Sequence, residues 1–375
     1  MRSFLRFLLS RRNSFKPPQQ THYKAMSTSS ASALLYAASV ASPAVAGTKP
    51  DDDFTKNKVW HLKHGGFENP WPSWQAMSGP SIMKAMISRR FSGASNSPDT
   101  TPPPNQKLRA TWLGHACYYV EFPGGLKVLF DPVFEDRCSP FSWLGPKRYT
   151  PPPCEVTDIP TIDAVIISHN HYDHLSLPTV TKISKQYPDV HFFVPLGNKK
   201  WFKESNIHNV TELDWWDEVD LTLTPKSGKD RSPSVTSADE PKPEGAITAR
   251  IGSLPCQHMT ARSLTDRCAT LWSSWSVTSG GKSIWFGGDT GYRAVPKESD
   301  GEDDWSEKWA HLPHNPEFKK IGTMRGPFDL GLIPIGATCL DVLEPPQKLK
   351  EALKHHNIPE EGVFDVCNIG ESREF

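Results

Sequence analysis

The chain has 375 residues, with 42 lysines and arginines against 42 aspartates and glutamates, so its formal net charge is zero. This balance argues against a nucleic-acid-binding protein, because such proteins carry an excess of basic residues. The seven cysteines show no CxxC spacing, which is typical of reduced thiols and not of a disulfide framework.

The first 50 residues are basic, rich in serine and free of aspartate and glutamate. This composition is typical of a mitochondrial transit peptide. The apolar run at 31–46 is shorter than the ~20 residues that a transmembrane helix needs. We therefore expect residues 1–55 to be a largely disordered targeting segment and linker of a mitochondrial, membrane-associated protein. The alternative is a cytoplasmic form that starts at Met26, or a location at another membrane surface.

Residues 56–106 form a second segment, a tryptophan-rich extension followed by a linker of serine, proline, asparagine and threonine. Trp60, Trp71 and Trp74 lie in its first part, and the run 82–87 has the pattern of a short amphipathic helix. These apolar residues have two interpretations. They touch a membrane, or they pack against the domain that follows.

Residues 107–375 carry the strand signals of an α/β domain. Short apolar runs predict strands at 108–113, 117–122, 127–130, 164–167, 191–194, 210–213, 248–254, 271–277, 283–286 and 329–335. Helical patterns cover 179–186 and 346–355. Two polar, proline-rich stretches at 226–245 and 297–316 are expected to be surface insertions. Many short strands with few helices predict two sheets covered by helices.

The most informative motif is His169-Asn170-His171-Tyr172-Asp173-His174, which directly follows the apolar run 164–167. Three imidazoles and a carboxylate at this density are ligands for zinc-like metals. His169 and His171 lie two residues apart, so their side chains can converge on one ion at a strand end. Asp173 and His174 can then serve a neighbouring ion.

Two more candidates follow the same strand-end logic. His258 comes after the predicted strand 248–254, and Asp289 comes after 283–286 and two glycines that permit a close approach of the backbone. A carboxylate that bridges two ions would be Asp289, and Asp173 would bind metal and orient the nucleophile as a catalytic residue. Zinc lowers the pKa of bound water to about 7, so the pattern predicts hydrolysis of an ester.

The motif at 169–175 resembles the signature of the metallo-β-lactamase superfamily. Further blocks resemble the family of N-acyl-phosphatidylethanolamine-hydrolysing phospholipases D: Phe67–Trp74, Trp112–Ala116, Gly145–Arg148, Leu213–Trp216, Gly287–Tyr292, Gly326–Leu330 and Gly370–Arg373. The resemblance covers residues 56–375 apart from the two insertions. It implies an αββα sandwich with two zinc ions at one edge.

The resemblance also implies the role of each site residue. One zinc would be held by His169, His171 and His258, the other by Asp173 and His174, with Asp289 bridging. Tyr172 and Arg262 match positions near the substrate phosphate, and a guanidinium suits a phosphodiester.

The chain departs from the family after residues 332–337. The family has a late histidine here that completes the second zinc site, but this sequence runs on to 343–346, which match the family's tail. A late helix and strand and the last ligand are therefore expected to be missing. His355 and His356 end a polar helix and are expected at the surface. The chain is then either an altered splice product of an active enzyme or a variant with a weakened second site.

The expected function is a zinc-dependent phosphodiesterase that cleaves N-acyl-phosphatidylethanolamine to N-acylethanolamine and phosphatidic acid. Its partner would be a phospholipid at a membrane surface, and no nucleic acid. Two alternatives stay open. One is another hydrolase of this fold that acts on thioesters, lactones or RNA, although the zero net charge argues against RNA. The other is a catalytically impaired variant that binds lipid or metal, which the missing histidine favours.

Overall fold

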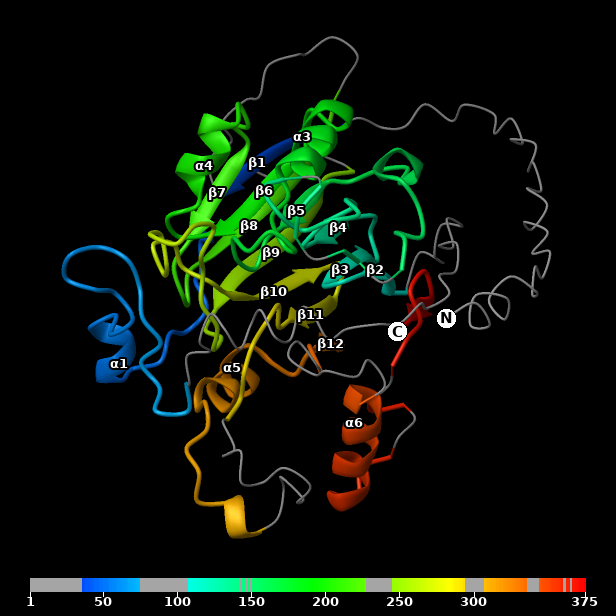
Figure 1. Cartoon of the computed structure of the whole chain (residues 1–375). Coiled ribbons are helices and arrows are strands. Elements are labelled where there is room, and N and C mark those ends of the chain that lie inside the picture. Colours follow the sequence, from blue (N-terminus) through cyan, green and yellow to red (C-terminus); the bar gives the residue numbers. More distant parts are fainter. Residues whose placement is uncertain are drawn as a thin grey trace, which may run out of the picture. The chain divides into compact units, whose positions relative to one another are not determined.

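Two β-sheets stack face to face in the part of the chain that the computed structural model describes (Figure 1). All of this part belongs to one unit, Tyr36–Phe375. The described residues are 36–74, 107–141, 143–145, 147–148, 150–226, 245–293, 307–335, 344–359, 362–364 and 366–375.

The first sheet combines antiparallel and parallel strands. Its order is β13 (Ser372–Glu374), β2 (Arg109–Gly114), β3 (Cys117–Glu121), β4 (Lys127–Phe130), β5 (Ala164–Ile166), β6 (His191–Pro195) and β7 (Val210–Leu213). The strands from β13 to β4 pair antiparallel, and those from β4 to β7 pair parallel. The carboxyl ends of β4 and β5 therefore meet at the same edge of the sheet.

The second sheet is antiparallel except at one end. Its order is β1 (Tyr36–Ala41), β8 (Glu218–Pro225), β9 (Ile247–Leu254), β10 (Ser274–Ser279), β11 (Lys282–Phe286) and β12 (Leu330–Leu332), with β11 and β12 parallel. Alternation decides which face is buried. In β8, Val219, Leu221 and Leu223 are buried while the residues between them are partly exposed.

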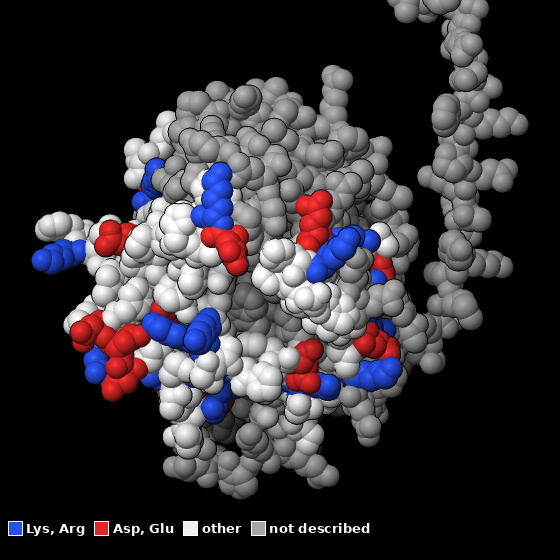
Figure 2. Space-filling model, turned by 90° about the horizontal axis from the view of Figure 1, so that it is seen from below, with Lys and Arg blue, Asp and Glu red and all other residues white. Residues whose placement is uncertain are grey.

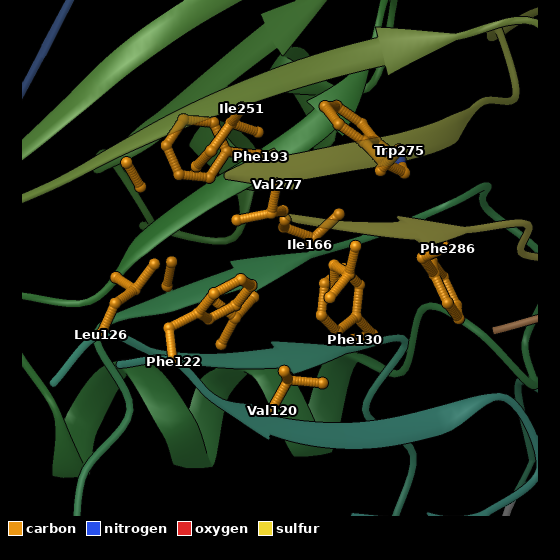
Figure 3. Close-up of a cluster of buried hydrophobic side chains, with 14 of the residues drawn as sticks. Val120, Phe122, Leu126, Phe130, Ile166, Phe193, Ile251, Trp275, Val277 and Phe286 are labelled. Atoms are coloured by element: carbon orange, nitrogen blue, oxygen red, sulfur yellow. The ribbon is translucent and has the colours of Figure 1, made fainter. Parts of the chain in front are cut away.

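The main core fills the space between the sheets. Figure 3 shows Val120, Phe130, Ile166 and Phe193 from the first sheet facing Trp275 and other side chains of the second. Phe130 of β4 contacts Phe286 of β11, with 4.8 Å between the ring centroids. Phe130 and Phe286 are the last residues of their strands, and the polar residues Asp131 and Asp289 follow them. The packed core therefore fixes the edge where these polar side chains lie.

Helices cover the outer faces. α3 (Leu177–Gln186) and α4 (Lys199–Glu204) form the crossovers between the parallel strands β5, β6 and β7. The outer apolar layer of the first sheet includes Val180 and Ile183 of α3. α5 (Glu317–Arg325) packs Phe318 against Trp285 of β11. The other helical segments are α1 (Asp53–Lys56), α6 (Glu344–His355), η1 (Val156–Asp158) and η3 (Glu307–Trp309).

The tryptophan-rich extension packs into the domain. Trp60 is 0% exposed and Trp71 is 6% exposed, and both contact the buried Trp215. Asp214, which is also buried, accepts hydrogen bonds from the Trp60 indole at 2.8 Å and from Lys58 at 2.6 Å. Of the two interpretations of this segment, packing against the domain therefore holds for Trp60 and Trp71, because their rings are enclosed by other aromatic side chains.

The α/β class with two mixed sheets is confirmed, and every predicted strand corresponds to an observed one, with shifted ends. β1 and all but the last residue of α1 lie inside the segment 1–55 that we expected to be largely disordered, so that expectation does not hold for residues 36–41 and 53–55. β8, β13, α4 and α5 were not predicted. The expected helix at 82–87, most of the insertion 226–245, part of the insertion 297–316 and the deletion point at 336–343 lie outside the described residues.

Candidate metal centre

The polar residues of the site lie within four residues of strand ends. His169 follows β5, His258 follows β9, Asp289 follows β11, and Asp131 follows β4. Gly288 shows why glycine precedes Asp289: its φ is +57°, and a Cβ there would lie 2.5 Å from the Cβ of Ser168. Glycine thus lets the end of β11 approach the start of the histidine motif.

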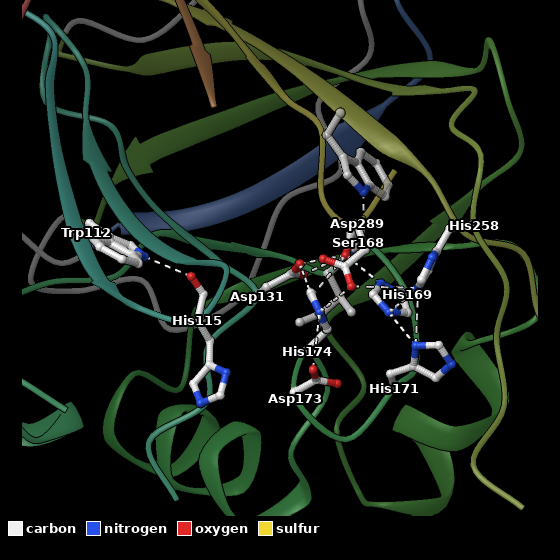
Figure 4. A network of polar contacts seen from close by, with 12 residues as sticks. Trp112, His115, Asp131, Ser168, His169, His171, Asp173, His174, His258 and Asp289 are labelled. Atoms are coloured by element: carbon white, nitrogen blue, oxygen red, sulfur yellow. Dashed lines mark hydrogen bonds and ion pairs between the residues drawn. The ribbon is translucent and has the colours of Figure 1, made fainter. Parts of the chain in front are cut away.

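Three ring nitrogens converge on one point. Nε2 of His169 lies 2.8 Å from Nδ1 of His171, and Nε2 of His258 lies 3.1 Å from the first and 3.2 Å from the second (Figure 4). A tetrahedral zinc with bonds of 2.0–2.1 Å would place its nitrogen ligands about 3.4 Å apart. The three nitrogens therefore fit a zinc-like ion if they move apart by a few tenths of an ångström on binding.

These three rings are in the chemical form that a metal needs. Burial lowers the pKa of His169 well below its usual value, lowers the pKa of His171, and lowers that of His258 to about 4. A histidine with a depressed pKa is neutral at pH 7, so its lone pair is available for coordination.

Carboxylates stand beside the three nitrogens. Oδ2 of Asp289 lies 3.8 Å from Nε2 of His258 and 3.4 Å from Nε2 of His174, which places it between these two rings. Asp173 approaches the same His174 nitrogen at 3.9 Å. Burial disfavours the charged form of His174, but Asp289, Asp173 and Asp131 outweigh it and raise its pKa well above the usual value.

A carboxylate that the sequence analysis missed orients two of the rings. Asp131 accepts hydrogen bonds from the Ser168 amide at 2.6 Å, from the Ser168 hydroxyl at 2.5 Å and from Nδ1 of His174 at 2.7 Å. The Ser168 hydroxyl in turn lies 2.9 Å from Nδ1 of His169. Both Nδ1 atoms are thereby engaged, which leaves Nε2 of each ring facing the cluster.

Asp131, His169 and His174 also form a group of the size that holds an ion. We interpret this group as a hydrogen-bonded support, because the donors on Asp131 already satisfy its oxygens. Figure 4 shows Asp131 and Asp173 on opposite sides of the His174 ring. The φ of Asp131 is +39°, a left-handed value that is uncommon outside glycine and is held here by these contacts.

The support of His174 yields a prediction. Asp131→Asn is expected to weaken zinc binding by about 10- to 100-fold, because an amide has one acceptor oxygen and cannot accept all three hydrogen bonds from Ser168 and His174. A competition titration with a chromogenic zinc chelator measures the change. Asp163→Asn is the matched control: Asp163 is also buried, but it accepts from the Lys127 amide, away from the ligands. Equal zinc affinity of Asp131→Asn and the unmodified chain would contradict this role.

The N-terminal extension supports the third histidine. The Asn69 side chain donates to the carbonyl of His258. Next to it, the Ser73 hydroxyl donates to the Gln257 side chain at 2.6 Å, and that side chain donates back to the Ser73 carbonyl at 3.1 Å. The segment 67–74 thus fixes the loop after β9. Sequence reasoning missed this role, because no local pattern links residues so far apart.

Tyr172 and Arg262, the expected substrate-phosphate residues, lie together beside the metal loop. The Arg262 guanidinium stacks over the Tyr172 ring, with Cζ 4.0 Å from its centroid. Its Nη1 donates to the carbonyls of Asn170 at 2.7 Å and Leu175 at 2.8 Å, which bracket the ligand residues 171–174. Arg262 therefore holds a positive charge at the site and also closes the ligand loop.

Of the expected site residues, the structure brings His169, His171, Asp173, His174, His258 and Asp289 into one cluster, with Tyr172 and Arg262 at its side.

On the face seen in Figure 2, described basic and acidic side chains alternate, in keeping with the zero net charge. Among the described residues, no helix combines the length and the apolar character needed to cross a bilayer.

Residues 127–341 match the family model described as a beta-lactamase superfamily domain. N-acyl-phosphatidylethanolamine-hydrolyzing phospholipase D 1 of Caenorhabditis elegans is 39% identical over 261 residues, which are 68% of this chain and 59% of that protein. The mitochondrial enzyme of the same name in Saccharomyces cerevisiae is 35% identical over 183 residues, 48% of this chain and 34% of that protein. The chain thus spans only part of the length of these relatives.

Among solved structures, an isothiocyanate hydrolase from Delia radicum gut bacteria is similar at 16% identity. The match covers 71% of this chain and 99% of that chain, with a TM-score of 0.39.

Proposed function

The chain belongs to the metallo-β-lactamase superfamily, and on that premise we propose that it is a zinc-dependent phosphodiesterase acting on N-acyl-phosphatidylethanolamine. The observation that carries the proposal is the convergence of the ring nitrogens of His169, His171 and His258 beside Asp289. The similarity to the nematode phospholipase D, whose match includes most of this chain, supports the choice of substrate.

Zinc held by these residues supplies a nucleophile from water at neutral pH and polarises a phosphoryl oxygen. In the reaction, the oxygen of water adds to phosphorus and the bond from phosphorus to the ethanolamine oxygen breaks. That oxygen takes up a proton, which releases N-acylethanolamine and leaves phosphatidic acid. Atoms and charges balance without a redox partner.

The protein's own residues have distinct proposed tasks. His169, His171 and His258 would hold one ion and Asp173 and His174 would hold a second, with Asp289 available to both. Asp173 would also orient the attacking water. Its side chain is 48% exposed, against 20% for Asp289, so its carboxylate can accept a hydrogen bond from a water molecule that enters from solvent. Arg262, with Tyr172 under its guanidinium, offsets the negative charge of the phosphodiester in the transition state.

The second ion has fewer donors than in the phospholipase D family. No histidine occurs between residues 336 and 354, so Asp173, His174 and Asp289 are the proposed ligands. This favours a second candidate function, a catalytically impaired variant that binds lipid or metal. We propose a mitochondrial, membrane-associated location, supported by the acid-free basic segment 1–50 and by the mitochondrial yeast relative.

The test is incubation of the zinc-loaded chain with vesicles that contain N-acyl-phosphatidylethanolamine, followed by mass spectrometry of the products. The proposal expects N-acylethanolamine and phosphatidic acid in equal amounts, and no hydrolysis of a soluble thioester or lactone. Turnover of a thioester or lactone without phospholipid cleavage would contradict the proposal and would indicate another hydrolase of this fold. Lipid binding without turnover, even at high zinc, would assign the impaired variant.

A further inference from the structure

A short hairpin projects from the loop that follows β4. Its base is closed by the Arg148 amide, which donates to the Asp136 carbonyl at 2.9 Å, and by an antiparallel bridge between Arg137 and Lys147. The Arg137 guanidinium adds a hydrogen bond to the Gly145 carbonyl at 2.6 Å. We refer to the described residues 137–141, 143–145 and 147 as the rim hairpin.

The tip of the rim hairpin is apolar and faces solvent. Phe141 is 52% exposed, Trp143 is 73% exposed and Leu144 is 52% exposed. The two aromatic rings contact each other at 5.7 Å, and the Leu144 amide donates to the Phe141 carbonyl at 3.2 Å. Single exposed apolar residues are normal on protein surfaces, but a fixed cluster with two aromatic rings indicates a contact surface.

The base of the rim hairpin is attached to the metal centre. Glu135, just before it, accepts hydrogen bonds from the Ser176 hydroxyl at 2.5 Å and the Thr179 hydroxyl at 2.9 Å. Ser176 directly follows the ligand loop 169–175. Leu177, the next residue, is also apolar and is 45% exposed. The hairpin therefore starts beside the segment that follows the histidine motif.

We propose that the rim hairpin inserts its tip into the interfacial region of a phospholipid bilayer and so brings the metal centre to the lipid headgroups. This inference rests on the proposed function, because a bilayer lipid is the substrate there. Arg137 and Lys147 lie at the base, behind the apolar tip, which matches the order of phosphates and hydrocarbon in a membrane. Tryptophan suits this boundary, since its ring is apolar and its N–H is polar.

Two further observations favour a membrane, and not another part of this protein, as the surface that the hairpin tip contacts. Lys147 pairs with Asp136 at 3.2 Å, but both side chains are largely exposed, at 58% and 63%, so lipid phosphate can replace Asp136 at little cost. The other aromatic-rich candidate, the segment 60–71, has its tryptophans buried. The hairpin thus supplies the membrane contact that the buried Trp60 and Trp71 cannot make.

The test is sedimentation with vesicles of phosphatidylcholine and phosphatidylethanolamine that contain no substrate. The triple variant Phe141→Ser, Trp143→Ser and Leu144→Ser is expected to bind at least about tenfold more weakly than the unmodified chain, because large apolar groups no longer transfer from water. The control variant Val45→Ser and Val363→Ser removes exposed apolar groups elsewhere, 76% and 65% exposed, and should bind normally.

Binding is read without turnover, so this result is independent of whether the chain hydrolyses the lipid. Equal vesicle binding by the triple variant would overturn the inference, and a change only in oligomeric state would assign the tip to contacts between copies of the chain. Should the triple variant unfold, brominated lipids give a second measurement. They should quench the fluorescence of the unmodified chain more than that of Trp143→Phe, and equal quenching would contradict insertion.

Discussion

His258→Ala is expected to abolish tight zinc binding, with a loss of hydrolytic rate on the order of 10³-fold in any assay that detects turnover. The reason is geometric. His258 supplies the third of three nitrogens that lie within 3.2 Å of one another, and it comes from the sheet opposite to the one that carries His169 and His171. Without it, two imidazoles from one loop remain at that position. Zinc content per chain after dialysis measures the change.

The control for this variant is His208→Ala, because His208 is exposed and lies between α4 and β7, away from the cluster. It should keep its zinc. A His258→Ala chain that retained as much zinc as the unmodified protein would place the ion elsewhere, for example on the cysteines.

The second large effect concerns the number of ions. We expect one zinc to bind tightly and the second to bind about 100-fold more weakly, a difference of ~2.7 kcal/mol, because one imidazole is missing from the second site. Isothermal titration of the metal-free chain with zinc resolves the two events. The weak second site should also leave the chain poorly active, with turnover that rises as zinc is added beyond one equivalent.

Two tightly bound ions per chain would contradict this expectation. It would then follow that a donor outside Asp173, His174 and Asp289 completes the second site. Asp289→Asn tests whether Asp289 serves both sites. The variant lacks the carboxylate proposed to serve both ions, so both binding events should weaken.

The histidine motif was readable from the sequence because its donors are contiguous and follow a buried strand. His258 and Asp289 were found by the same strand-end rule, which works because the core between the sheets fixes where those strands end. Asp131 obeys the rule as well, at the end of β4, but a single carboxylate before a proline carries no local sign of its hydrogen bonds to Ser168 and His174.

In the fold, too, elements with a local sequence signal were predicted, and elements that depend on distant contacts were not. Strands with consecutive apolar residues, such as β5 and β6, were predicted with nearly correct limits. β1 was not, because four of its six residues are alanine or serine, which have weak strand preference, and its strand is decided by six paired positions with β8. The burial of Trp60 depends on Asp214 and Trp215, which lie far along the chain, so its sequence neighbours could not reveal it.

The most direct test of the metal centre is X-ray absorption spectroscopy of the chain loaded with one equivalent of zinc. The account predicts nitrogen and oxygen neighbours at about 2.0–2.1 Å with the outer-shell scattering of several imidazoles, as expected for His169, His171 and His258. Sulfur neighbours at about 2.3 Å, or a spectrum without imidazole scattering, would show that these histidines do not hold the ion.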